Sequence, residues 1–121
     1  MDLIISEKSI AGKRIASILS KNKFNTVVEN GVNCFSFDFE GKETMVIPLR
    51  GHINTVDFVG DNNYWNIYAL DVLADKQLTY LAVEKAIISC LKKKRTNLEN
   101  IIVATDADRE GEAIGVEAYN Y

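Results

Sequence analysis

Apolar residues fall into short runs and helical repeats that alternate along the chain. Residues 2–6, DLIIS, form an apolar run bounded by polar residues, which predicts a buried strand. Residues 7–23 carry apolar residues at helical spacing and predict a helix, which Gly12 weakens a little. The residues at that spacing are Ala11, Ile15, Ile18 and Leu19.

Three further strands are predicted before the middle of the chain. Residues 25–29 form one strand, which leads into a turn at Asn30-Gly31. Residues 33–49 form two strands joined by a tight turn at Glu40-Gly41, and Pro48 marks the end of the second. In the first of these two, Phe35, Phe37 and Phe39 alternate with polar residues, as expected for a half-exposed strand.

The pattern then changes. Residues 52–75 are irregular, with the sequence GDNN predicting a loop at residues 60–63. Residues 76–95 predict a helix whose basic end, residues 92–95, complements the helix dipole. Its apolar face would consist of Tyr80, Val83, Ile87, Cys90 and Leu91.

The last part repeats the strand–helix order of the first. Residues 100–106 predict a buried strand, and residues 109–121 begin a helix. Strands and helices that alternate at both ends indicate an α/β fold with a parallel core sheet. Sites in such sheets lie beyond the carboxyl ends of the strands. If the first and last strands are parallel neighbours, Glu7, Asp106 and Asp108 converge at one edge.

Composition sets the limits of this interpretation. The 121 residues suit one domain, and no apolar run is long enough to cross a membrane. The N-terminus lacks the pattern of a signal peptide, so we expect a cytoplasmic protein. Cys34 and Cys90 are too few for a metal knuckle; a reduced core is expected, with a disulfide as the alternative.

The negative charge of the chain is concentrated in one place. The net charge is −3, and four acids face one arginine within residues 106–112, DADREGE, so acids and bases balance elsewhere. Two carboxylates about 4 Å apart repel by roughly 4 kcal/mol at an effective dielectric near 20. Asp106 and Asp108 would project the same way from an extended segment. Hard oxygen ligands of this kind suit Mg²⁺, while a hydrated acidic turn without a ligand is the alternative.

An EF-hand loop that binds Ca²⁺ is a second alternative. From Asp106 the residues D-A-D-R-E-G, with Glu117 at position 12, come close to the EF-hand pattern. Such a loop needs helices on both sides. Residues 97–106 look like a strand, which argues against this hypothesis.

The sequences IISEK near the start and ATDADREGEAIG near the end resemble the Toprim domain of type IA DNA topoisomerases, including reverse gyrase. RGHINTVDF resembles the Gly-His segment of the family. Other Toprim proteins, such as bacterial primases and nucleases, usually lack the R-E-G-E continuation, and a phosphotransferase or nuclease of that kind remains the alternative. The resemblance spans residues 1–121 and implies a Rossmann-like fold with a mainly parallel sheet flanked by helices.

The resemblance also implies roles for individual residues. Glu7 would be the catalytic glutamate beside the scissile phosphate, and Asp106, Asp108 and Glu110 would form the Mg²⁺ site. The residues expected to contact DNA phosphate or support the site are Lys8, Arg109 and His52. Glu112 matches the motif and would open the helix without binding metal.

In the family, a tyrosine in a separate downstream domain attacks single-stranded DNA, and the break is later resealed. The five tyrosines here match no such motif; they are Tyr64, Tyr68, Tyr80, Tyr119 and Tyr121. We therefore expect an N-terminal piece of a longer, nucleoid-associated enzyme, monomeric and inactive alone, whose partners are its own downstream domains and single-stranded DNA.

Overall fold

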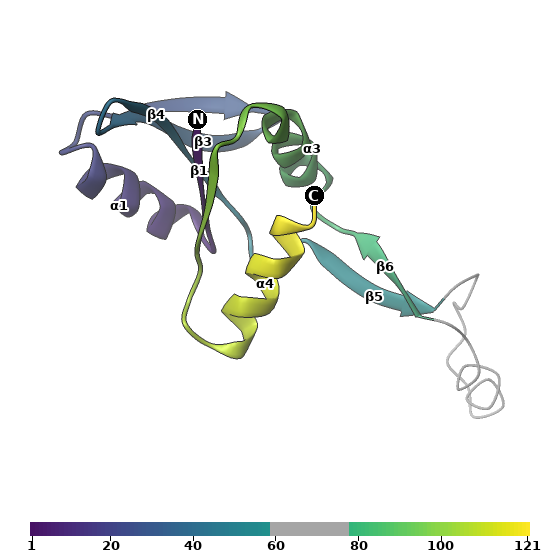
Figure 1. The fold of residues 1–121 in the computed structure, drawn as a ribbon. Helices are drawn as coiled ribbons and strands as arrows, with labels where there is room; N and C mark the ends of the chain where they lie inside the picture. The colour runs from purple at the N-terminus through teal and green to yellow at the C-terminus, as the bar shows by residue number, and fades with distance from the viewer. Residues whose placement is uncertain (59–77) are drawn as a thin grey trace, which may run out of the picture.

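A computed structural model describes residues 1–58 and 78–121, and a five-stranded sheet forms its centre (Figure 1). The strand order is β2-β3-β4-β1-β7. Its strands are β1 (Asp2–Ser6), β2 (Asn25–Glu29), β3 (Val32–Phe39), β4 (Lys42–Pro48) and β7 (Asn100–Ala104). Strand β1 is parallel to β4 and β7, and β3 is antiparallel to β2 and β4. Only β3 is reversed, which confirms the predicted α/β fold with a mainly parallel sheet.

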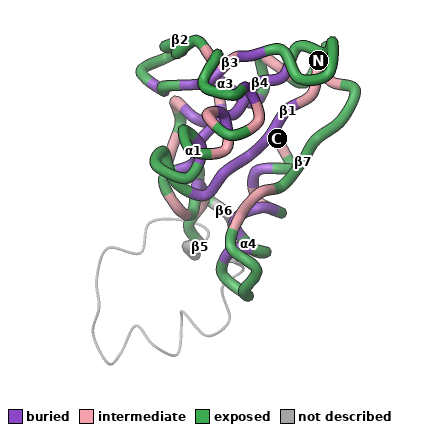
Figure 2. Tube along the Cα trace, turned by 90° about the vertical axis from the view of Figure 1, so that its left-hand side faces the viewer, coloured by how far each residue is buried: buried purple, intermediate pink, exposed green. Residues whose placement is uncertain are grey.

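Helices cover both faces of this sheet. Successive strand residues point to opposite faces, so Leu3 and Ile5 pack with α3 (Lys85–Lys94) and α4 (Arg109–Tyr119), while Ile4 packs with α1 (Ser9–Leu19). Strand β1 is therefore buried on both sides (Figure 2). None of the described helices is both long and apolar enough to cross a membrane.

The two predicted hairpin turns are confirmed. Asn30 and Gly31 have φ values of 51° and 79°, and Glu40 and Gly41 have 54° and 81°. Positive φ at both central residues is typical of the type I′ turn, whose twist matches that of the paired strands. These turns connect β2 to β3 and β3 to β4, and β4 ends at Pro48 as predicted.

The predicted helix over residues 76–95 is wrong in its first half. Residues Leu78–Ala82 form strand β6, which pairs antiparallel with β5 (Asn54–Phe58), and α3 begins only at Lys85. Thr79 and Tyr80 favour strands, and β5 supplies a partner that periodicity along one segment cannot reveal. The irregular region expected over residues 52–75 missed β5, and the predicted GDNN loop lies outside the described residues. A short 3₁₀ turn, η1 (Arg95–Asn97), follows α3.

The last strand was correctly predicted, but its burial was not. Strand β7 lies at the edge of the sheet, next to β1. Its apolar side chains are 37% (Ile101), 47% (Ile102) and 45% (Val103) exposed. An apolar run of this length predicts a strand without telling whether the strand lies inside a sheet or at its edge.

The buried face of α1 also differs from the prediction. Gly12 and Ala16 face the sheet, whereas Ala11 is exposed and Ile18 is 68% exposed. A Cβ atom on Gly12 would lie 2.6 Å from Ser6 Oγ, so the glycine lets α1 approach the sheet closely. The residue that weakens the helix locally therefore contributes to packing.

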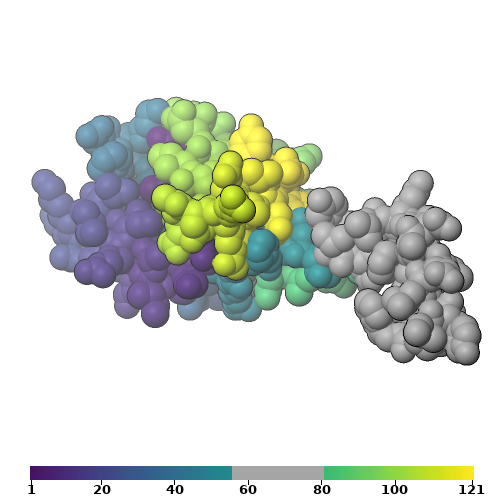
Figure 3. Space-filling view, turned by 90° about the horizontal axis from the view of Figure 1, so that it is seen from below, coloured from purple at the N-terminus to yellow at the C-terminus, as the bar shows by residue number. Residues whose placement is uncertain are grey.

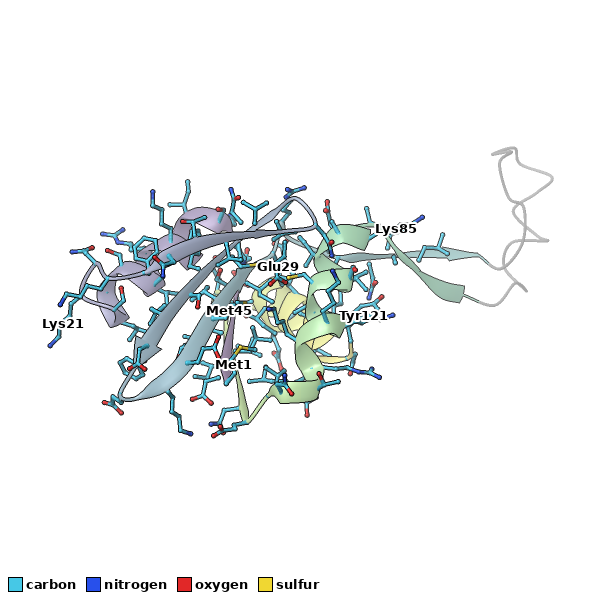
Figure 4. All side chains as sticks on the ribbon, turned by 90° about the horizontal axis from the view of Figure 1, so that it is seen from above. Met1, Lys21, Glu29, Met45, Lys85 and Tyr121 are labelled. Atoms are coloured by element: carbon cyan, nitrogen blue, oxygen red, sulfur yellow. The ribbon has the colours of Figure 1, made fainter. Side chains whose placement is uncertain are left out.

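Two buried thiols link β3 to α3. Cys34 Sγ and Cys90 Sγ lie 3.7 Å apart, and both cysteines are free, as expected for a reduced core. The hydrogen bond with Cys34 raises the pKa of the Cys90 thiol. Close by, Lys94 Nζ contacts Glu29 Oε1 at 2.7 Å, and Figure 4 shows Glu29 beside α3.

The pair formed by Glu29 and Lys94 makes stability depend on pH. The hydrogen bond from Lys94 holds the pKa of Glu29 below its ordinary value of 4.5. A lowered pKa in the folded state means that the stabilisation is complete above pH 4.5 and is lost as the pH falls through the folded value. We expect Glu29→Gln to lower the free energy of unfolding at pH 7 by about 0.5–1 kcal/mol. Urea unfolding at pH 7 and at pH 3–4 measures the free energy of unfolding of both proteins. The difference between them should be smaller at the lower pH.

The matched control is Glu40→Gln, which removes an exposed carboxylate at a hairpin turn. It should leave the pH dependence unchanged. If Glu29→Gln and the parent protein lose the same free energy of unfolding between pH 7 and pH 3, the pair does not contribute.

Candidate active site at the carboxyl edge of the sheet

The site begins where β1 and β7 end. In their parallel register Ser6 lies opposite Ala104, so Glu7 and Asp106 follow at the same edge. The Asp106 backbone N–H donates to Glu7 Oε2 at 3.1 Å, although 99 residues separate the two. Glu7 is only 9% exposed. Glu7 therefore contacts the acidic segment, as predicted.

The acidic segment is a turn and a helix start. The Asp108 backbone N–H donates to Asp106 O at 2.9 Å, so the two aspartates do not lie on an extended segment as predicted. The reason is that β7 ends at Ala104 and Asp108 is the N-cap of α4. Its Oδ1 accepts from the Gly111 backbone N–H at 2.6 Å, which satisfies an amide that the helix leaves free. Glu110 and Glu112 lie in the first turn, where negative charge is favourable.

Gly111 makes this turn possible. A Cβ atom there would lie 2.0 Å from Asp106 O, which is a backbone atom and cannot move aside cheaply. The helix start thus sits directly against the aspartate turn. The glycine of the D-A-D-R-E-G sequence is explained by packing, and its φ is not in the left-handed region.

A cleft of about 480 Å³ opens beside Glu7. It is lined by Glu7, Lys8, Ser9, Ile10, Leu49, Arg50, Gly51 and Glu110. Seen from below, the N-terminal residues, the residues around 50 and the start of α4 gather on one face (Figure 3). The cleft combines two acids with two bases, Lys8 and Arg50. Arg50 is the first residue of RGHINTVDF, but no role was predicted for it.

His52 lies on the other side of Glu110. Its Nδ1 contacts Glu117 Oε1 at 2.8 Å, and its Nε2 lies 3.8 Å from Glu110 Oε1. Glu117 Oε2 accepts from the backbone N–H groups of Ile53 and Asn54 at 3.1 and 3.3 Å. Both carboxylate oxygens of Glu117 therefore contact residues 52–54. In addition, the element before Asp106 is strand β7, whereas an EF-hand loop follows a helix. The EF-hand alternative is wrong for both reasons.

The remaining predicted residues are at the surface. Lys8 is exposed at the start of α1 and lines the cleft. Arg109 is exposed as the first residue of α4, and the ion pairs of the described residues do not include it.

The carboxylates have the right chemistry for a hard cation. Glu7, Asp106, Asp108 and Glu110 supply only oxygen donors, which Mg²⁺ prefers. Within residues 1–58 and 78–121, however, no three candidate ligands are already arranged around one point. Asp108 uses one oxygen as the N-cap and keeps the other. The residues fit a weakly held, partly hydrated Mg²⁺ better than a closed metal cage.

Similarity to known proteins shows the family to which the chain belongs. The family model described as the Toprim domain matches residues 2–121, and the chain belongs to this family. It is 40% identical over 116 residues to DNA topoisomerase 1 of Thermoplasma acidophilum, and 39% identical over 116 residues to that of Archaeoglobus fulgidus. It is 31% identical over 130 residues to DNA topoisomerase 3 of Schizosaccharomyces pombe.

These alignments cover 96%, 96% and 98% of the chain, but only 15%, 17% and 21% of the three relatives. The predicted resemblance to type IA DNA topoisomerases is confirmed. The chain spans less than a quarter of the length of these curated relatives.

We expect Gly111→Ala to destabilise the chain by about 1–3 kcal/mol, even though alanine favours helices, because its Cβ would overlap backbone. Thermal unfolding measures the loss. Glu112→Ala, the exposed neighbour, should change stability by no more than about 0.5 kcal/mol. Equal melting temperatures for the two variants would contradict the close contact with Asp106.

Proposed function

We propose that this chain is the Mg²⁺-binding domain of a type IA DNA topoisomerase and supports transient cleavage and religation of single-stranded DNA. The observation that carries the proposal is the meeting of Glu7 with the D-x-D-x-E segment at one sheet edge, in a Toprim chain similar to DNA topoisomerases 1 and 3. Such an enzyme would work on chromosomal DNA in the cytoplasm.

The cleft suits a phosphodiester. A DNA backbone that approaches Glu7 and Glu110 is repelled, and Lys8 and Arg50 in the same cleft offset part of that repulsion. Asp106, Asp108 and Glu110 would hold Mg²⁺, which would supply the remaining positive charge and fix the DNA backbone. Arg109 is exposed beside them and is available for a phosphate.

Glu7 is the proposed proton donor. When a nucleophile attacks phosphorus, the departing 3′-oxygen gains negative charge, and a positioned carboxyl group stabilises it by giving up a proton. Only one Glu7 oxygen contacts the Asp106 amide, so the other is available for the reaction. The amide also fixes the orientation of the carboxyl group.

The nucleophile would come from another domain. Tyr121 donates its hydroxyl to Asn54 Oδ1 at 2.6 Å. Tyr119 is exposed at the far end of α4, about 15 Å along the helix from the acidic turn. Tyr64 and Tyr68 lie outside the described residues, and of Tyr80 only the backbone is described. The isolated chain should therefore not cleave DNA.

Magnesium binding can be tested on the chain itself. In ¹⁵N NMR spectra, millimolar Mg²⁺ should shift signals of residues 104–112 most strongly. Asp108→Asn should weaken the effect severalfold without loss of fold, because asparagine is an equally good N-cap but has no charge. Glu40→Gln serves as the control. Shifts spread evenly over all acidic residues would contradict a site at this edge.

The chemistry can be tested in a chimera in which residues 1–121 replace the matching part of Thermoplasma acidophilum DNA topoisomerase 1. We expect the chimera to form covalent adducts with single-stranded oligonucleotides, and Glu7→Gln to reduce cleavage about 10²-fold or more, because glutamine keeps the shape but has no acidic proton. Glu40→Gln is again the control. A chimera without adducts, or a Glu7→Gln chimera with the parent cleavage rate, would refute the proposal. Magnesium-dependent nicking without an adduct would favour a Toprim nuclease.

A further inference from the structure

Glu117 binds several groups in the segment after β4, and the proposed function gives it no role. Its side chain is 19% exposed and extends from the third turn of α4 to the loop after β4. One carboxylate oxygen contacts His52 Nδ1, and the other accepts from the backbone N–H groups of Ile53 and Asn54. Three groups of residues 52–54, at the end of the loop and the start of β5, are therefore held by a single carboxylate.

These contacts decide which atom of His52 faces the acidic site. A carboxylate accepts hydrogen bonds and donates none, so Nδ1 must carry the proton in the contact with Glu117. Nε2 is then the ring nitrogen that remains available. It lies 3.8 Å from Glu110 Oε1, which is too long for a hydrogen bond but places it beside the acidic cluster.

Two carboxylates of helix α4 face the two nitrogens of the ring. Glu110 and Glu117 are seven residues apart, which is about two turns, so they lie on the same face of the helix. Each of them approaches a different nitrogen of His52. The ring therefore lies along α4, with Nε2 toward its acidic start.

The loop that carries His52 is fixed by its backbone as well. Ile53 O accepts from the N–H groups of Val83 and Glu84 at 2.9 and 3.3 Å, and the Ile53 side chain is fully buried. Gly51, with φ of 85°, permits the turn from β4 into this loop. With the backbone held, the contact with Glu117 determines the ring orientation.

We propose that Glu117 is a positioning residue for the DNA-cleaving site: it fixes His52 so that Nε2, and never Nδ1, faces Glu110, the acidic residue that borders the cleft. The inference rests on the proposed function. Glu117 itself does not touch the substrate. It acts through His52, by setting both the position of the ring and the nitrogen that carries the proton in the neutral form.

Glu117→Gln separates this role from a purely structural one. The glutamine oxygen can still accept from the Ile53 and Asn54 amides and keep the loop in place. Its NH₂ group then faces Nδ1, which must become an acceptor, so the ring proton moves to Nε2. The variant therefore preserves the loop and reverses the tautomer.

His52 is the only histidine, so ¹⁵N-histidine labelling of the 121-residue chain gives the signals of one ring. With the ring neutral, we expect proton-bearing Nδ1 to predominate in the parent and proton-bearing Nε2 in Glu117→Gln. The backbone signals of Ile53 and Asn54 should remain ordered. Glu112→Gln, an exposed carboxylate in the first turn of the same helix, should match the parent.

The parent spectrum is decisive even if Glu117→Gln fails to fold. Proton-bearing Nε2 in the parent would overturn the inference, as would an unchanged tautomer in folded Glu117→Gln. In the chimera with the Thermoplasma enzyme, Glu117→Gln should slow cleavage at saturating DNA about tenfold or more, with DNA affinity unchanged. It should have no further effect when His52 is already alanine, because a positioning residue acts only through its partner.

Two failures can be distinguished. If Glu117→Gln reverses the tautomer but the chimera cleaves at the parent rate, the positioning role is wrong and the proposed function stands. If Glu7→Gln cleaves at the parent rate, the proposed function itself is wrong.

Discussion

The parallel pairing of β1 with β7 is the constraint on which the candidate site depends. It brings together the two ends of the chain, with Ser6 opposite Ala104, so that the next residues of both strands emerge at one edge. The hydrogen bond from the Asp106 amide to Glu7 extends this pairing into the side chains. Because β1 also pairs with β4, the loop that carries Arg50 and His52 leaves the sheet at the same edge. Three distant segments thus share one site through the neighbours of a single strand.

The sequence was sufficient where local chemistry determines structure. The apolar run of β1, bounded by polar residues, has few alternatives to a buried strand. Asn30-Gly31 and Glu40-Gly41 predict hairpin turns because these turns need positive φ at both central positions. The convergence of Glu7 and Asp106 followed from strand–helix alternation, since parallel strands end at the same edge. The acidic positions were therefore predictable on one condition, the parallel pairing of the first and last strands, which the structure shows.

The sequence was insufficient where a partner determines structure. Leu78–Ala82 continues a helical repeat, but pairing with β5 makes it a strand. The residues of β7 have the apolar sequence of a core strand but are about half exposed, because β7 lies at the edge of the sheet. The sequence of a strand does not determine its position in the sheet. The sequence assigned no role to Arg50, and it pointed to Glu117 only through the EF-hand pattern, which is wrong. Their importance follows from the cleft that Arg50 shares with Glu7 and from the loop to which Glu117 binds.

Backbone amides, more than cations, organise the acidic cluster. Glu7 accepts from the Asp106 amide, Asp108 from the Gly111 amide, and Glu117 from the amides of Ile53 and Asn54. A backbone N–H orients a carboxylate and lowers its energy without cancelling its charge. The site can therefore be ordered and remain negative, which an arrangement of close ion pairs with lysine or arginine would not allow. An ordered cluster that retains its charge suits the proposed Mg²⁺, which would be shared with a phosphate group at the cleft beside Lys8 and Arg50.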